Sequence, residues 1–367
     1  MSRRFLARFG LRAAVSSAIA VVALLTSAQL CEAAAIKLTQ ISTTFNSPIG
    51  IDYHEPTNSV VMSVNYFGGV PRNFERVNFD GSHTPFSTAS GFTDEVKIAT
   101  VRSGNMGGFT TGDLFTGNGV DGEIVRITAG GATVINPWVS LPGSGNGLMR
   151  GALHVDRTGV FGGDLIVVTT AGEVWRITSG GSHTKLADVN VHLEGVSTVP
   201  NDAAKYGPLA GKIIAGAEGV GLLYAFDTLG NVSTYNVGVN IEDIDLIPAN
   251  ENFFGVNFGT GTLLGAPASE FSPFAGDILL TQEFPSGTGL YRLFWNGSSL
   301  VAEQFTLKAG SANPGQWEHV TFAPAGISEI DPVAVPEPAT LTLLGIAATC
   351  LGGFGWRARR RVLIGGR

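Results

Sequence analysis

The chain has 367 residues, of which 44% are hydrophobic and only 14% are charged, and it contains 50 glycines. This composition can bury a sizeable core and is rich in turns, which excludes general disorder and collagen-like repeats. The two ends hold nine of the 23 basic residues but only two of the 30 acidic ones, so residues 36–332 carry a net charge of −14. A body this acidic repels phosphate backbones, which argues against nucleic-acid binding.

The first 35 residues predict a secretory signal peptide, because four arginines precede an apolar stretch over 13–25 and small residues follow it. We expect cleavage near Ala33 or Ala35, and export by the general secretory route and by the twin-arginine route are both open. Both cysteines, Cys31 and Cys350, lie outside residues 36–332. A disulfide framework, a cysteine-ligated zinc site and a cysteine nucleophile are therefore excluded from the body of the protein.

Short apolar runs bounded by glycine recur about every 50 residues through residues 36–332. Each unit has a first strand after a Gly-Asp or Gly-Lys pair and a second strand about ten residues later. This rhythm predicts an all-β fold, a β-propeller of six blades. A β-sandwich would explain the strands but not their recurrence. We expect residues 35–42 to complete the last blade, while residues 250–275 break the rhythm as an insertion or a degenerate blade.

Two charged positions repeat together with these strands. An arginine near the end of the second strand recurs in four units, and we expect it to pair with acids between blades: Arg76, Arg126, Arg176 and Arg292. An aspartate follows the glycine at the start of three units and is interpreted as a turn residue: Asp113, Asp164 and Asp277.

A glutamate recurs in the segments that precede the hairpins, and in a propeller these segments form the innermost strands. Four of them are expected to face one mouth of the central channel, with Arg150 as the single cation: Glu95, Glu194, Glu242 and Glu318. Converging carboxylates repel one another unless a cation is present, and hard oxygen ligands favour Ca²⁺. Three roles stay open: strand starts in solvent or bonded to backbone amides, ligands of a bound metal, and a catalytic role.

The blade rhythm resembles that of the NHL and SMP-30/gluconolactonase propellers. In the SMP-30-like enzymes a Glu-Gly pair at the start of an inner strand supplies a carboxylate to a central divalent metal, and Glu194-Gly195 matches this pair. The asparagine and aspartate residues that complete the enzyme site have no counterparts at equivalent positions. The resemblance therefore implies the propeller fold and leaves hydrolysis of a lactone or ester as the alternative function.

The C-terminal residues combine three features in a fixed order. Pro336-Glu337-Pro338 precedes eighteen uncharged residues, 339–356, which as a helix would cover about 27 Å of bilayer. An arginine cluster that favours the cytoplasmic side follows: Arg357, Arg359, Arg360 and Arg361. This order closely resembles the PEP-CTERM sorting signal. The resemblance implies a Gram-negative bacterial protein that is held in the inner membrane by this helix and processed near the Pro-Glu-Pro motif by an exosortase-type enzyme.

The sequence thus predicts a signal peptide over 1–35, a β-propeller over 36–332 and a sorting signal over 333–367. We expect an exported, membrane-anchored precursor that reaches the cell envelope, the cell surface or the exopolysaccharide matrix of a biofilm. The leading function is a non-catalytic binding module, with extracellular polysaccharide as a partner. The alternative is a Ca²⁺-dependent lactonase or esterase of the SMP-30 type.

Overall fold

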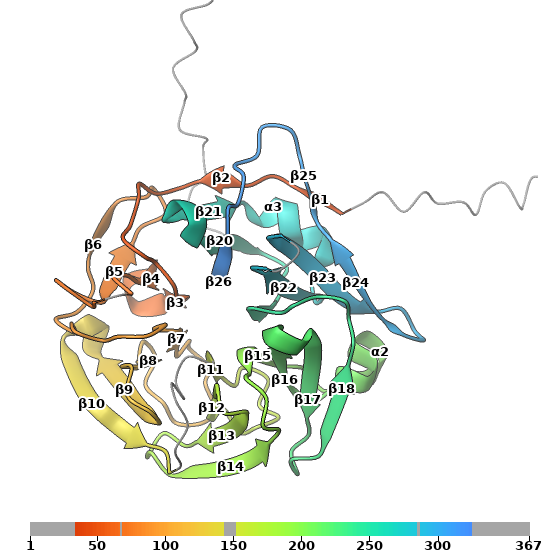
Figure 1. Ribbon diagram of the computed structural model, residues 1–367, viewed down its shortest axis with the longest axis horizontal. Helices are drawn as coiled ribbons and strands as arrows, with labels where there is room; N and C mark the ends of the chain where they lie inside the picture. Colours follow the sequence, from red (N-terminus) through yellow and green to blue (C-terminus); the bar gives the residue numbers. More distant parts are fainter. Residues whose placement is uncertain (1–33, 67, 143–151, 285–286, 325–367) are drawn as a thin grey trace, which may run out of the picture.

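The computed structural model describes residues 34–66, 68–142, 152–284 and 287–324. These residues form a ring of six four-stranded antiparallel sheets around a central axis (Figure 1). The protein is therefore a six-bladed β-propeller, as the repeat predicts. Residues 1–33 of the predicted signal peptide and the whole sorting signal lie outside the described residues, whereas Ala34 and Ala35 belong to the described part of the chain. Within those residues, no helix is long and apolar enough to cross a membrane.

Blades 1 to 4 each take four consecutive strands, from the axis outwards. Blade 1 holds β3 (Ile51–His54), β4 (Ser59–Ser63), β5 (Phe74–Val77) and β6 (His83–Pro85). Blade 2 holds β7 (Ile98–Thr100), β8 (Leu114–Gly117), β9 (Glu123–Thr128) and β10 (Thr133–Ser140). Blade 3 holds β11 (Ala152–Val155), β12 (Leu165–Val168), β13 (Glu173–Ile177) and β14 (His183–Asp188). Blade 4 holds β15 (Glu194–Thr198), β16 (Ile213–Ala217), β17 (Leu222–Phe226) and β18 (Val232–Tyr235).

Blades 5 and 6 are interleaved in the sequence, because a hairpin that lies between two strands of blade 5 belongs to blade 6. We call this arrangement the strand exchange. Blade 5 consists of β19 (Ile244–Leu246), β22 (Ile278–Gln282), β23 (Gly289–Trp295) and β24 (Leu300–Gln304). Between β19 and β22 the chain crosses to blade 6 and forms its two middle strands, β20 (Glu251–Asn257) and β21 (Thr262–Ala266). The inner strand of blade 6, β26 (Trp317–Pro324), then pairs with β20. Residues 250–275 therefore break the rhythm because they contain the middle hairpin of the neighbouring blade.

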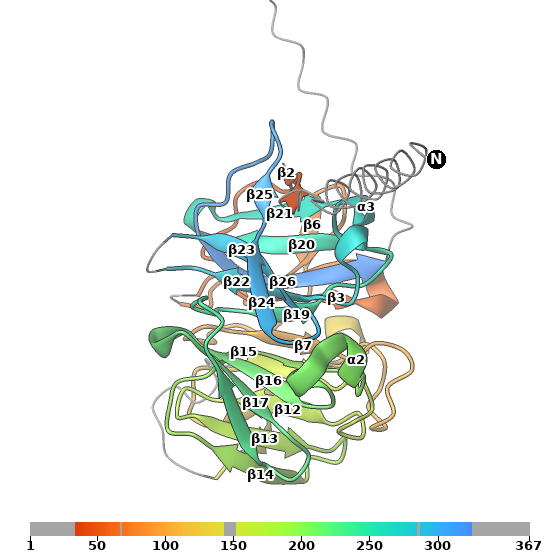
Figure 2. The ribbon, with the colours of Figure 1, turned by 90° about the vertical axis from the view of Figure 1, so that its right-hand side faces the viewer.

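The short helices show where this hairpin enters. In blade 4, α2 (Ala203–Tyr206) lies between the first and second strands, and in blade 5 α3 (Ala268–Phe271) lies directly before the second strand. Figure 2 shows α2 and α3 on the same side of the ring. The β20–β21 hairpin is thus inserted into the loop that in blade 4 holds α2. The 3₁₀ turns are η1 (Glu55–Thr57), η2 (Ala129–Gly131), η4 (Gly207–Leu209), η5 (Glu218–Val220), η6 (Phe258–Thr260) and η7 (Ser272–Phe274).

The N-terminal strands close the ring. The outer strand of blade 6 is β2 (Thr39–Gln40), which pairs with β21. Next to it, β1 (Ala35–Ile36) pairs in parallel with β25 (Thr306–Leu307). The prediction that residues 35–42 complete the last blade is confirmed. Blade 6 therefore joins three chain segments that are far apart in the sequence.

The hydrophobic core consists of six clusters, one between each pair of neighbouring blades. Between blades 5 and 6, the ring of Phe253 stacks on Phe271 with centroids 4.8 Å apart and meets the edge of Trp317 at 5.9 Å. All three side chains are fully buried. Truncating one such aromatic residue to alanine lowers the free energy of unfolding by roughly 3–5 kcal/mol. These buried contacts therefore hold the β20–β21 hairpin in blade 6.

The repeating arginine and aspartate form an ion pair within each of blades 2, 3 and 5. The Nη2 atoms of Arg126 and Arg176 lie 2.7 Å from the carboxylates of Asp113 and Asp164, respectively. In blade 5 the corresponding pair, Arg292 and Asp277, is 3.5 Å apart. The expectation of pairing between blades is wrong for these three arginines. In an antiparallel pair, the residue before the second strand lies beside the end of the third strand, where the arginine stands.

A pair of cysteines tests the strand exchange. Asn252 in β20 and Ala323 in β26 are directly opposed, and opposed residues of antiparallel strands have Cα atoms roughly 4.5–5.5 Å apart, within disulfide range. In a variant whose Cys31 and Cys350 are serine, Asn252→Cys with Ala323→Cys should form an internal disulfide, identified by mass spectrometry of the linked peptides. The control combines Asn252→Cys with Ala302→Cys in β24. A link in the control but not in the test pair would contradict the exchange.

Candidate functional site

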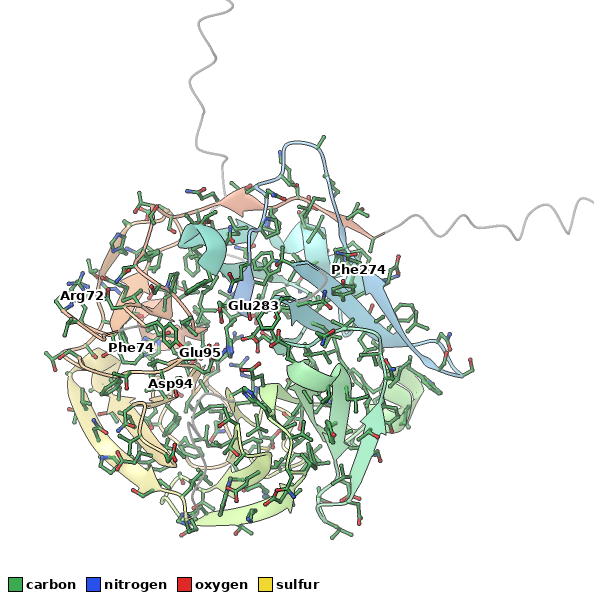
Figure 3. All side chains as sticks on the ribbon, viewed as in Figure 1. Arg72, Phe74, Asp94, Glu95, Phe274 and Glu283 are labelled. Atoms are coloured by element: carbon green, nitrogen blue, oxygen red, sulfur yellow. The ribbon has the colours of Figure 1, made fainter. Side chains whose placement is uncertain are left out.

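The inner strands begin at one end of the ring, and glutamates gather there. Glu194 opens β15, Glu318 is the second residue of β26, and Glu95 and Glu242 precede β7 and β19. Figure 3 shows Glu95 near the centre of the ring, with Glu283 close by. The structure thus brings all four predicted glutamates to the axis. We call this end the glutamate mouth and define it by Glu95, Glu194, Glu218, Glu242, Glu283 and Glu318.

Glu218 and Glu283 were not foreseen from the sequence. Each follows directly on the second strand of its blade, β16 in blade 4 and β22 in blade 5. The signal that could have found them is this shared position in the repeat. The Oε1 atom of Glu283 accepts a hydrogen bond from the side-chain amide of Gln316, just before β26.

Lys97 supplies the cation at the centre of the glutamate mouth. Its side chain is fully buried, and its Nζ lies 2.6 Å from Oε1 of Glu242 and 3.7 Å from carboxylate oxygens of Glu95 and Glu318. Arg150 lies outside the described residues, so its place at this mouth stays a prediction, but the expectation that it is the single cation is wrong because Lys97 is a cation there too. Lys97 stands two residues after Glu95 and directly before β7, and its backbone N–H donates a hydrogen bond of 3.0 Å to the carbonyl oxygen of Glu95.

The charge state of Lys97 is set by its neighbours. Burial favours the neutral amine, but the carboxylates of Glu242, Glu95 and Glu318 outweigh it and raise the pKa of Lys97 well above its ordinary value. Lys97 is therefore charged across the physiological pH range. It can balance only one of the six glutamates of the mouth if all of them are ionised.

The remaining charge is spread unevenly. Burial, followed by the proximity of Glu194 and Glu283, raises the pKa of Glu218 to about 8. Burial also raises the pKa of Glu318 well above its usual range, against the attraction of Lys97. For Glu194, the hydrogen bond from His192 and the charge of Lys97 outweigh burial and lower the pKa. The mouth therefore needs protons or a further cation near neutral pH.

Three glutamates form a group beside Lys97. Glu194, Glu218 and Glu242 each present a carboxylate oxygen, and these oxygens lie within 4.8 Å of one another. The side chain of Glu218 is 9% exposed, and its Oε1 has no hydrogen-bond partner among the described residues. An unpaired buried oxygen is costly, so this group fits a bound cation. Of the four predicted ligands, Glu95 and Glu318 instead lie around Lys97.

Gly195 allows the close approach of two of these carboxylates. Its φ is +52°, and a Cβ at this position would lie 2.6 Å from the Cα of Asp243. Only glycine fits there, because a side chain would collide with the backbone that follows Glu242. The glycine after Glu194 is thus required by backbone packing, whether or not Glu194 binds a metal.

Replacing Lys97 tests the charge balance. Lys97→Met should lower the free energy of unfolding by roughly 3–5 kcal/mol at pH 8, because buried carboxylates lose their cation. The loss should be smaller at pH 5. A carboxyl whose folded pKa is raised contributes stability below its unfolded pKa and loses it as the pH rises through the folded pKa. Urea unfolding at both pH values measures the effect, with exposed Lys37→Met as the control. Equal stability of Lys97→Met and the parent at pH 8 would contradict the account.

Comparison with known proteins identifies the tail. Residues 334–361 match the family described as the PEP-CTERM protein-sorting motif, which confirms the resemblance drawn from the sequence. This motif implies an exported, membrane-anchored precursor that is processed by an exosortase. No curated protein matches the chain.

Several solved structures are similar to the propeller. A gluconolactonase from Xanthomonas campestris is 14% identical, with a TM-score of 0.47 over 77% of this chain and 81% of its own. A catalytically inactive virginiamycin B lyase from Staphylococcus aureus, solved with quinupristin, is 13% identical, with a TM-score of 0.45 over 77% and 92%. A chain of the nidogen/laminin complex is 12% identical, with a TM-score of 0.42 over 76% and 85%. At these identities the likeness concerns the fold alone.

Proposed function

We propose that this protein is an exported, non-catalytic binding module of the cell surface or its polysaccharide matrix. The observation that supports this proposal is the position of Lys97, whose buried ammonium lies 2.6 Å from Glu242. A fixed internal cation stands at the axis, where the glutamates of a metallohydrolase would meet their metal. The raised pKa of Lys97 also keeps its amine protonated, so Lys97 is neither a nucleophile nor a base at neutral pH.

A Ca²⁺ ion beside Lys97 would complete the charge balance. Glu194, Glu218 and Glu242 offer only oxygen ligands, which suit Ca²⁺ better than a transition metal. Their mutual spacing, within 4.8 Å, is compatible with one shell of Ca–O bonds of about 2.3–2.6 Å. The unpaired Oε1 of Glu218 supports this site. In this role the ion joins the starts of blades 4 and 5 and stiffens the mouth.

A Ca²⁺-dependent lactone or ester hydrolase is the second candidate. The observation that favours it is His192, whose Nε2 lies 3.0 Å from Oε1 of Glu194 and whose side chain is 42% exposed. A histidine oriented by a carboxylate can act as a general base. A bound Ca²⁺ would polarise a substrate carbonyl. The missing asparagine and aspartate residues of the SMP-30-type site weigh against this function.

The route to the cell surface follows from the sorting motif. We propose that the signal peptide over 1–35 directs export and that the helix over 339–356 holds the precursor in the inner membrane. An exosortase-type enzyme then cuts near Pro336–Pro338. The partner of the released propeller in this proposal is extracellular polysaccharide.

Calorimetric titration with Ca²⁺ tests the cation site. The full-length protein in detergent should show one saturable site at pH 8 that Glu218→Gln removes. Binding should weaken from pH 8 to pH 5, because protons compete for Glu218, whose pKa is about 8. Glu270→Gln is the control, since Glu270 pairs with Lys308 on the outer rim. No heat of binding by the parent protein at pH 8 would contradict the Ca²⁺ site.

Hydrolysis assays separate the two functions. If the protein is a binding module, neither the parent nor His192→Gln should hydrolyse any of a panel of lactones and aryl esters in the presence of Ca²⁺. Turnover that requires Ca²⁺ and falls at least about 100-fold in His192→Gln, the usual size of general-base catalysis, would establish the hydrolase instead.

A further inference from the structure

A cavity lies at the end of the ring opposite the glutamate mouth, where the inner strands end. Its volume is about 260 Å³, and it is bordered by side chains from blades 2 to 6. We call it the arginine mouth and define it by Arg102, His154, Arg157, Thr198, Asp245 and Phe322. Thr198 ends β15, the strand that Glu194 opens at the glutamate mouth. The two sites are therefore separated by the length of the inner strands.

A second, smaller and mostly polar cavity leads inwards from the arginine mouth. This cavity of about 40 Å³ continues the arginine mouth inwards, since both cavities touch His154, Arg157 and Asp245. Its wall contains the polar side chains of Asp52, Asp243, His319 and Thr321 as well as one aliphatic residue from each inner strand: Ile51, Ile98, Leu153, Val196, Ile244 and Val320. Among the described residues, no glutamate of the glutamate mouth borders either cavity, so a ligand in the arginine mouth does not contact those glutamates.

The two arginines are held in place by acidic partners. Nη1 of Arg102 lies 2.8 Å and 3.1 Å from the two carboxylate oxygens of Glu251, and its guanidinium lies over the ring of Tyr53, 5.2 Å from the centroid. Nη2 of Arg157 lies 3.2 Å from Oδ2 of Asp52. Each guanidinium thus has a carboxylate partner, and the arginines add no net charge to the cavity. Arg157 is still 32% exposed and can donate to a ligand.

Asp52 makes this arrangement rigid. Its buried carboxylate accepts hydrogen bonds from the backbone N–H groups of Tyr53 and Thr100, both at 2.7 Å, and from the hydroxyl of Thr321 at 3.0 Å. These partners belong to blades 1, 2 and 6. The donor side of the cavity is therefore positioned before a ligand arrives.

The acceptor side of the cavity is Asp245. Its Oδ1 accepts a hydrogen bond of 2.8 Å from the backbone N–H of Leu246, and Asp245 forms no ion pair within the described part of the chain. His154 is kept neutral, because burial lowers its pKa to about 3, and its Nε2 lies 3.2 Å from the hydroxyl of Thr198. Burial raises the pKa of Asp245 to about 7, so its ionised carboxylate is a strong acceptor above this pH, and the wall combines it with the Arg157 donor, a neutral imidazole and a hydroxyl.

We propose that the arginine mouth binds one neutral sugar ring. Each hydroxyl of a sugar both donates and accepts, so it can donate to Asp245 and accept from Arg157 at the same time. Leu246, Pro200 and Pro248 add apolar wall for the C–H faces of the ring. Charged sugars fit the cavity less well than neutral ones. The ammonium group of an amino sugar would be repelled by Arg102 and Arg157. The carboxylate of an acidic sugar would be repelled by Asp245, and the arginines already have carboxylate partners.

The size of the cavity sets the length of the ligand. Drug-sized ligands occupy clefts of roughly 300–1,000 Å³, so about 260 Å³ admits one ring and not a longer oligosaccharide. The ligand is therefore a single residue, free or at the end of a chain. This inference rests on the proposed role as a binding module and names its ligand class, but it does not depend on Ca²⁺ at the glutamate mouth.

Saturation-transfer NMR and calorimetry on the full-length protein test the site with glucose, galactose, mannose and N-acetylglucosamine. At least one should bind with a dissociation constant on the order of 1 mM, as expected for so small a ligand. Asp245→Asn keeps the shape of the side chain and should weaken binding at least about tenfold. Leu246→Trp fills the cavity without removing a charge and should abolish binding. Glu218→Gln, at the other mouth, is the matched control and should bind the sugar as the parent does.

The outcomes separate this inference from the proposed Ca²⁺ site. Sugar binding that persists in Glu218→Gln and in excess chelator supports the arginine mouth whatever the Ca²⁺ titration shows. The inference is overturned if none of the four sugars gives saturable transfer, or if Asp245→Asn and Leu246→Trp both bind as the parent does. It is also overturned if glucosamine or glucuronate binds more tightly than every neutral sugar.

Discussion

The structure depends on a charge constraint at its axis. A propeller brings the starts of its inner strands together, and here four of the six strands bring a glutamate with them, while loops of blades 4 and 5 add two more. Such a ring is stable only if a cation or bound protons offset the repulsion. Lys97 meets part of this need from within the chain, with its fully buried Nζ 2.6 Å from Glu242. The unpaired oxygen of Glu218 marks the place where a further cation or a proton is still required.

The two ends of the axis solve different problems with the same strands. At the glutamate mouth carboxylates exceed cations, whereas at the arginine mouth Arg102 and Arg157 are matched by Glu251 and Asp52.

The ring closes through a blade that is assembled from separate chain segments. Blade 6 combines β2, the β20–β21 hairpin and β26, so neighbouring blades are tied by shared chain as well as by their cores. The last strand, β26, ends at Pro324 beside the arginine mouth, ten residues before the sorting motif.

The sequence was sufficient for the blade count, the closing strand and the convergence of four glutamates, because these depend on a regular repeat. It was not sufficient for the strand exchange, since periodicity locates strands but does not say which sheet they join. Lys97 stands in one of the aligned segments, but no other segment has a lysine at this position, so the repeat does not mark it. The arginine mouth left no motif at all. Its residues stand at matching positions of the repeat, since His154, Thr198 and Phe322 each lie four residues after Arg150, Glu194 and Glu318, but the residue type differs from blade to blade, so no recurring residue marks the site.

The central claim is that a charged lysine occupies the middle of the glutamate mouth. The chain has six lysines, so ¹⁵N NMR of the side-chain ammonium groups can resolve each of them, with Lys97→Met assigning the signal. The account predicts one ammonium signal that exchanges slowly with water and stays protonated at a pH where the other five have begun to titrate. A Lys97 signal that titrates at or below the ordinary lysine pKa would contradict the account.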